Sequence, residues 1–384
     1  MNRLSSHRTR PARAERGQIL VILALGMVAF IGGVAVVIEG GNAYAHQRIT
    51  QNASDSVANA GATILAQRLG GGNQSDADVL AATDAMATAN NLDSYAAWYT
   101  NVTGGLLNAA GATVSNPAAA AEVGSGAIPP GTQGVHAAGS QAFETTFARV
   151  LGFTQFTTSA DATAVAGAIT GGEFLPVVFP VSLANCDGSG DTVVTDEPWR
   201  LSNPNANPNL PPVGQEYIVP LCKTGTGAFQ ILDLDPNKDC EEEVMNPTSV
   251  HFNQFPVNVL VDEGNDCAKK IEDSISAKDL QGKVVMIPIC DGACHTQDSG
   301  NDKSYHIIRI ASFYLDYISY SNNDNNGACA LATSPTYGTD LDNIVGGNGS
   351  SSCIAGWFVR YVTNGPVGTG QINNGEAVGV QLIR

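Results

Sequence analysis

An uninterrupted uncharged run lies near the amino end of the chain, at residues 19–38. At a rise of about 1.5 Å per residue, a helix of this length spans the roughly 30 Å hydrocarbon core of a bilayer. The run exceeds the apolar region of a cleaved signal peptide, and no A-x-A site closes it. The pattern therefore predicts one retained transmembrane helix.

Helical periodicity follows the span. Between residues 43 and 69, apolar residues recur at steps of three and four and form a thin stripe made of Ile49, Ala53, Val57, Ala60 and Ile64. Such a stripe suits packing against a neighbour better than forming a large core. We expect this stem to be broken only at Gly40-Gly41 and to stop at Gly70-Gly71-Gly72-Asn73. A second helix is then predicted, capped by Ser75 or Asp76 and running to about Asn91.

Residues 93–170 predict a small α+β unit. We expect a strand at residues 134–137, a short helix at residues 143–152 closed by Gly152, and a strand at residues 154–168.

The pattern becomes typical of β structure from residue 171 onward. Short apolar runs alternate with Gly, Asn, Asp and Pro clusters; they lie at residues 175–183, 217–221, 229–234, 257–261, 284–289, 307–320, 356–362 and 377–383. The expected fold class is α+β, with one N-terminal transmembrane helix, a helical stem and a β-rich extracytoplasmic domain with disulfides. The corresponding segments are 1–18, 19–38, 39–92, 93–170 and 171–384.

Charge orients this arrangement. Residues 1–18 hold five arginines and a single acid, Glu15, so the positive-inside rule places the amino end in the cytoplasm and the bulk of the chain outside. The whole chain has a net charge of −17, which argues against binding nucleic acid through bulk charge.

The cysteines gather in the second half of the chain. All eight follow residue 185, which favours disulfides in an oxidising compartment; they are Cys186, Cys222, Cys240, Cys267, Cys290, Cys294, Cys329 and Cys353. Their spacing mildly favours Cys290–Cys294 and Cys329–Cys353, but eight cysteines leave the pairing open.

One acidic turn is a weak candidate for calcium. Oxygen ligands recur on alternate residues at Asp233, Asp235, Asn237 and Asp239, as in a calcium loop. Lys238 stands where such a loop has its glycine, and Val244 where it has its last glutamate. A solvated acidic turn is the plainer interpretation. A zinc site could be formed by Cys290, Cys294, His295 and His306. A disulfide is the stronger interpretation of these cysteines.

No catalytic motif is present. The sequence lacks G-x-S-x-G, a P-loop and H-E-x-x-H, and its six histidines stand apart. We expect neither an enzyme nor a required cofactor.

Three groups of residues form distinctive motifs. The main one joins an R-G-Q entry, a G-N-x-Y turn and a Q-N-A-x-D run, carried here by Arg16, Gly17, Gln18, Gly41, Asn42, Tyr44, Gln51, Asn52, Ala53 and Asp55. The other two lie at residues 146–152 with 159–164, and at residues 227–235. All three resemble segments of a known family, the TadE/TadG-like proteins of Flp (tight-adherence) pilus assembly. Ile22 occupies the position at which type IV-like prepilins have a glutamate, and no D-x-S-x-S metal motif of a von Willebrand A domain is present.

The resemblance implies a non-enzymatic component of a pilus or secretion apparatus in a bacterial cell membrane, either minor pilin-like or an assembly subunit. Its expected partners are the bilayer and other pilus subunits, contacted through the transmembrane helix and the stem. The alternative is a membrane-anchored extracellular binding or adhesion module. Calcium bound at the acidic turn could stabilise such a module. A dispersed hydrolase site is a more distant alternative.

Overall fold

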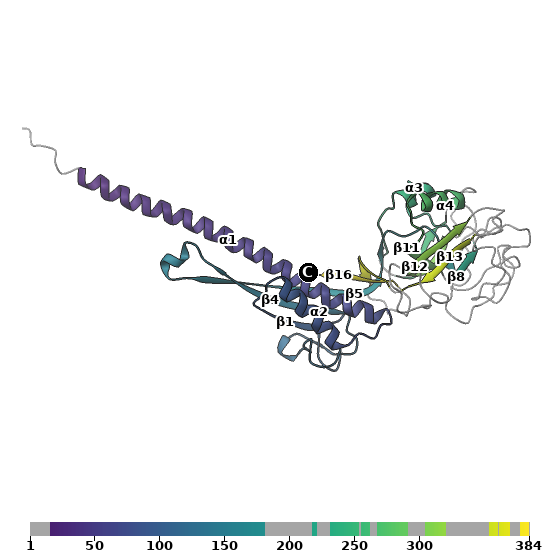
Figure 1. Ribbon diagram of the computed structural model, residues 1–384, viewed down its shortest axis with the longest axis horizontal. Helices are drawn as coiled ribbons and strands as arrows, with labels where there is room; N and C mark the ends of the chain where they lie inside the picture. The colour runs from purple at the N-terminus through teal and green to yellow at the C-terminus, as the bar shows by residue number, and fades with distance from the viewer. Residues whose placement is uncertain are drawn as a thin grey trace, which may run out of the picture.

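The computed structural model describes residues 16–180, 217–220, 231–252, 255–261, 267–290, 304–319, 353–359, 361–368 and 377–383. It opens with one helix of 54 residues, α1 (Arg16–Leu69). The N-terminal part of α1 projects beyond the rest of the described fold, and its C-terminal part lies along a sheet (Figure 1).

The expected break at Gly40-Gly41 is wrong, because α1 runs through both glycines. Each glycine weakens a helix by about 1 kcal/mol relative to alanine but still makes the helical hydrogen bonds. The span on one side and the packed stem on the other both favour helix. The G-N-x-Y element is therefore a helical segment rather than a turn.

The stop and the second helix are confirmed. Gly70 and Gly72 donate backbone hydrogen bonds to the last carbonyls of α1, at Ala66 and Gln67. Helix α2 (Asp76–Ala89) begins with a capping box, in which Ser75 and Asp78 each bond the backbone N–H of the other.

The first sheet is eight-stranded within the described residues and has the order β14-β16-β5-β4-β1-β2-β3, with β15 on β5. Its first half comes from β1 (Ser94–Thr100), β2 (Leu106–Leu107), β3 (Thr113–Val114), β4 (Gly134–Glu144) and β5 (Gln155–Ile169). A short 3-10 turn, η1 (Pro117–Ala119), follows β3. The other strands are β14 (Val362–Asn364), β15 (Val367–Gly368) and β16 (Val378–Ile383).

Helix α1 packs on this sheet through small residues. Val57, Ala58 and Ala62 of α1 form one core cluster with alanines of β4 and β5 and with Val378 and Val380 of β16. The expected stripe is correct at Ala53 and Val57, whereas Ile49 is exposed. Small side chains let the helix lie close to the sheet and fix its position.

The helix expected at residues 143–152 is largely wrong. Strand β4 continues to Glu144, and Phe143 pairs with Phe156 of β5. Only Ala148–Leu151 coils, as the 3-10 turn η2, and Gly152 closes it in the left-handed region as expected. Cross-strand pairing outweighs local helix propensity here. The resulting β4–β5 hairpin runs back along α1.

The second sheet has the order β7-β11-β12-β13-β8, with β10 on β12. Its strands are β7 (Phe179–Pro180), β8 (Tyr217–Pro220), β10 (Val257–Leu260), β11 (Lys283–Cys290), β12 (Ser304–Ser319) and β13 (Cys353–Phe358), and a separate pair joins β6 (Gly171–Gly172) to β9 (Val250–His251). Two helices absent from the sequence-based expectation, α3 (Cys240–Met245) and α4 (Cys267–Ala277), bury Val244, Ile271 and Ile275 against Ile287 and Phe313 of this sheet.

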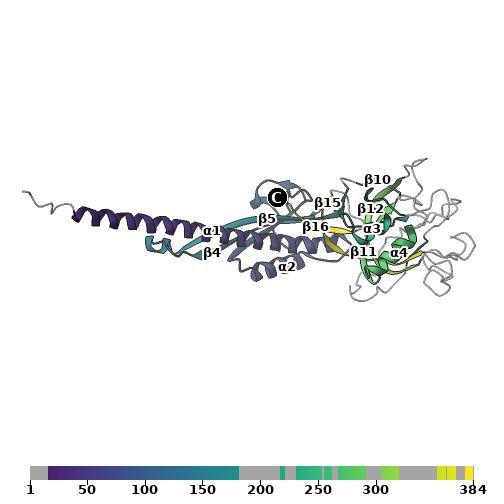
Figure 2. The same ribbon diagram turned by 90° about the horizontal axis from the view of Figure 1, so that it is seen from above.

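The boundary expected at residue 171 does not separate the two sheets cleanly. Strand β16 pairs antiparallel with β5, from Val378 opposite Ala168 to Ile383 opposite Thr163. The chain thus returns to the first sheet after building the second. Figures 1 and 2 show the second sheet and its helices at the end of the molecule opposite to the N-terminal part of α1.

Candidate functional site: the apolar helix and its junction with the sheet

The apolar part of α1 is left largely uncovered by the other described elements. Its large side chains between Ile19 and Ile38 are exposed, and α1 is the single helix in the described residues that is long and apolar enough to cross a membrane. In water such a surface would be very unfavourable. A lipid environment therefore suits residues 19–38.

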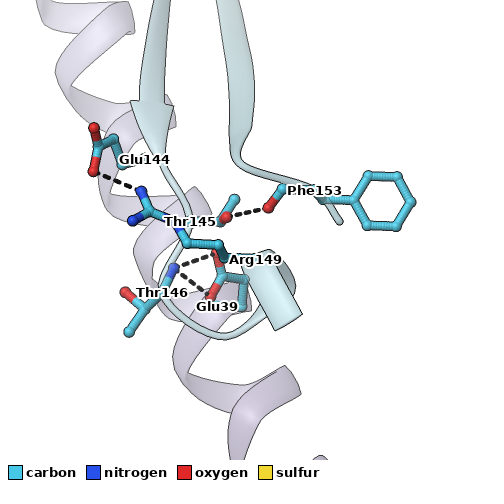
Figure 3. Close-up of polar contacts among 6 residues, drawn as sticks. All are labelled: Glu39, Glu144, Thr145, Thr146, Arg149 and Phe153. Atoms are coloured by element: carbon cyan, nitrogen blue, oxygen red, sulfur yellow. Dashed lines mark hydrogen bonds and ion pairs between the residues drawn. The ribbon is translucent and has the colours of Figure 1, made fainter. Parts of the chain in front are cut away.

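Glu39, the residue that ends the apolar run, joins α1 to the hairpin. It is 8% exposed, and its carboxylate accepts hydrogen bonds from the backbone N–H groups of Thr146, at 3.2 Å, and Phe147, at 3.0 Å. Figure 3 shows the carboxylate facing Thr146, just before η2 begins. These donors offset the cost of burying a charge. Sequence reasoning missed this contact.

Polar residues of the Gln51–Asp55 run attach the stem to β5. Ser54 donates to the Ala160 carbonyl at 2.9 Å, and Gln51 donates both to the Asp161 carbonyl and to Asp55. Ala53 is buried, while Asn52 is exposed. Just before this run, Thr50 shares a 2.7 Å hydrogen bond with Thr158. The family motif thus contains residues that hold helix and sheet together.

The other motif residues lie in α1 away from the sheet. Arg16, Gly17 and Gln18 form its first turn. Gly41 has no atom within 4 Å of the position that a Cβ would take. Tyr44 is exposed and accepts hydrogen bonds from Arg48, whose guanidinium lies 5.6 Å from the ring centroid.

Asp76 ties α2 to β1 and to the loop that follows η1. Its carboxylate accepts hydrogen bonds from the Tyr99 hydroxyl at 2.5 Å and from the backbone N–H groups of Gly124 and Gly126. Burial alone would raise the pKa of Asp76, but these hydrogen bonds hold it below its ordinary value. Burial, together with the bond to Asp76, raises the pKa of Tyr99. The group is a structural tie between elements.

Two carboxylates of the acidic turn already have hydrogen-bond or ion-pair partners in the folded chain. Asp235 accepts hydrogen bonds from Asn237 and Thr248, and Asp239 caps α3 through the Glu242 N–H and pairs with Lys270 at 3.1 Å. The hydrogen bond from Thr248 lowers the pKa of Asp235, and that from Glu242 lowers the pKa of Asp239. No group of three or more His, Cys, Asp or Glu side chains in the described ranges is placed to hold a metal.

The described cysteines lie in the second sheet and its helices. Cys240 opens α3 and Cys290 ends β11, and both side chains are buried. Cys267 opens α4 and Cys353 opens β13. Cys186, Cys222, Cys294 and Cys329 lie outside the described residues, as does His295, so neither favoured local pair is tested. His306 lies on β12, with its Nδ1 2.9 Å from the Asn258 side-chain oxygen.

These features define a class: an α+β protein with a candidate membrane-spanning helix that continues, unbroken, into the core of its first sheet. Residues 17–66 of the chain match the model of the Flp pilus-assembly TadE/G-like family, named Tad. This match confirms the resemblance through the first of its three groups of residues, and it covers both the span and the sheet-bound stem; the later two groups lie outside the matched residues. Comparisons with characterised proteins and with solved structures give no significant match.

Proposed function

We propose that the protein is a non-enzymatic, single-pass membrane subunit of a Flp-type pilus assembly or secretion apparatus, minor pilin-like or acting in assembly. The observation that carries the proposal is the family match at residues 17–66, which coincides with the unpartnered span and the stem. The arginine-rich leader supports a cytoplasmic amino end and an extracytoplasmic bulk.

The continuous helix suggests how such a subunit works. At about 1.5 Å per residue, α1 is roughly 80 Å long. Its outer half is fixed to the first sheet, so a contact made in the bilayer determines where the external sheets lie. Partner subunits would recognise the span and the exposed side of the stem.

The span offers close approach to another transmembrane helix. Ala29 and Gly33 lie four residues apart, and a Cβ added at Gly33 would meet no atom within 4 Å in this chain. Small residues at this spacing let two helices pack closely in lipid.

Disulfides in the second half of the chain belong to the same proposal. All eight cysteines follow residue 185, and those at Cys240 and Cys290 are buried. An oxidising, extracytoplasmic compartment would form and keep such bonds.

The test is deletion of the gene followed by complementation, with surface pili and co-purification of pilus components as the readouts. We expect deletion to remove the pili and the full chain to restore them. The double substitution Ala29→Leu with Gly33→Leu should insert normally, because it adds apolar surface, yet should reduce both readouts. Val37→Leu is the matched control. Normal pili in the deletion strain would refute the proposal.

A further inference from the structure

The tip of the β4–β5 hairpin lies at the level where α1 leaves its apolar segment. Contacts between the helix and the hairpin proceed in order toward the amino end of α1: Ser54 bonds Ala160, His46 stacks on Phe143, and Glu39 bonds Thr146. Residues 148–153 come next on the hairpin, beyond Glu39. They therefore lie beside the C-terminal end of the span rather than over the stem (Figure 1).

Three apolar side chains are exposed on this tip and on the adjoining start of β5. Val150 is 87% exposed, more than any other large apolar side chain in the described chain, and Phe153 and Phe156 are 57% and 37% exposed. Phe153 points away from α1 (Figure 3). Apolar side chains gathered on so small a tip mark a contact surface.

The tip is also held in a fixed shape. Glu39 binds its two backbone N–H groups, the Thr145 N–H donates to the Thr154 carbonyl at 3.1 Å, and Gly152, with a φ of 93°, closes η2. Arg149, at the same end, pairs with Glu144 at 2.8 Å, and both side chains are exposed. The tip thus presents apolar side chains beside a cation.

We propose that residues 145–154 form a second membrane contact, which inserts Val150 and Phe153 into the interfacial region of the leaflet from which α1 emerges. The inference rests on the membrane anchoring in the proposed function. The occupant is lipid because the tip is continuous with the span: Glu39, which binds it, directly follows Ile38. Apolar rings favour the headgroup boundary, and Arg149 can meet lipid phosphate there. With two attachments to the bilayer, α1 and the sheet packed on it cannot tilt freely relative to the membrane.

The experiment uses the full chain reconstituted in phosphatidylcholine vesicles, with and without lipid brominated near the top of its acyl chains. Bromine quenches tryptophan fluorescence at close contact. Phe153→Trp adds a probe at the tip, Phe30→Trp adds one in the span, and Leu382→Trp adds one on β16. Leu382 pairs with Ala164, beyond the stem contact at Ala160 and away from the tip. The unsubstituted chain supplies the background of the native tryptophans.

We expect brominated lipid to remove fluorescence from the added tryptophans at positions 30 and 153 and to leave that at position 382 unchanged. Quenching at position 30 without quenching at position 153 overturns the membrane contact and leaves the anchor intact. Failure to quench at position 30 overturns the anchor and the contact with it. Should Phe153→Trp misfold, Val150→Trp serves the same test, because that side chain is the more exposed of the two.

Discussion

The carboxylate of Glu39 accepts a 3.0 Å hydrogen bond from the backbone N–H of Phe147, 108 residues further along the chain. This contact fixes the hairpin tip to the first residue after the apolar span. Glu39→Ala should release the tip, because a hydrogen bond to a charged group contributes roughly 1.5–3 kcal/mol. We expect amide hydrogen exchange at Thr146 and Phe147 to rise about 10- to 100-fold, with little change in the sheet.

Glu144→Ala is the control for this prediction. Glu144 lies on the same hairpin, but its ion pair with Arg149 is exposed on both sides, and such pairs contribute about 0–1 kcal/mol. Exchange at Thr146 should remain close to that of the parent. Equal exchange in Glu39→Ala and Glu144→Ala would show that the buried carboxylate does not hold the tip.

Local signals in the sequence predicted the elements of the N-terminal half well. The uncharged run and the Ser75 cap are local features, so the sequence alone predicts the span and α2. It does not predict the hydrogen-bond partner of Glu39, because that partner lies more than a hundred residues away. The helix expected at residues 143–152 fails for the same reason, since Phe143 meets its partner Phe156 only when β4 pairs with β5.

Other misses carried a usable signal. Ile271 and Ile275, four residues apart and both buried, mark one face of α4. Asp239 and the three glutamates that follow Cys240 are a typical helix start, with a cap and acids in the first turn. No local sequence pattern predicts that β16 pairs with the first sheet, since its apolar run would suit either sheet.

The Asp76 tie should make stability depend on pH in the acid range. Its pKa is lower in the folded chain than the ordinary value near 3.9. The stabilisation is therefore present above that value and is lost as pH falls through the folded pKa. Asp76→Asn should lower the free energy of unfolding by about 1–3 kcal/mol near neutral pH. It should also make the melting temperature depend less steeply on pH in the acid range. Thermal unfolding at a series of pH values measures both effects.

Tyr99→Phe is the matched variant for Asp76. It removes one donor to the carboxylate and leaves the charge and the two glycine N–H groups in place. We expect a smaller loss of stability, and we expect the acid-induced fall in melting temperature to begin at a higher pH. An Asp76→Asn chain with the pH dependence of the parent would contradict the role assigned to the carboxylate.

Two glycines of α1 should respond oppositely to alanine. A Cβ at Gly61 would lie 2.8 Å from Cγ2 of Val135, a buried and stiff side chain, and 3.1 Å from Cγ2 of Thr83. Overpacking of about 1–3 kcal/mol should exceed the helix-propensity gain of about 1 kcal/mol, so Gly61→Ala lowers the melting temperature. Gly41→Ala meets no neighbour and should be neutral or slightly stabilising. A stabilised Gly61→Ala chain would mean that the helix does not pack this closely on the sheet.

The acidic turn should not depend on calcium. Hydrogen bonds within the turn and the cap on α3 already occupy oxygens of Asp235 and Asp239. We expect the same melting temperature with a chelator as with added calcium. A rise with calcium that Asp235→Asn abolishes would instead support the calcium-stabilised binding module.

The buried cysteines should resist alkylation until they are reduced. Cys240 and Cys290 lie in the cores on the two faces of the second sheet, and the proposed function has both of them in disulfides. The unfolded chain should therefore take up no alkylating agent at these positions before reduction, as measured by peptide mass. After reduction, the second sheet should lose about 2–4 kcal/mol of stability for each bond broken, whereas the first sheet and α1, which lack cysteine, should unfold as before. Full alkylation of the unfolded, unreduced chain would refute the disulfides and weaken the argument for an oxidising compartment.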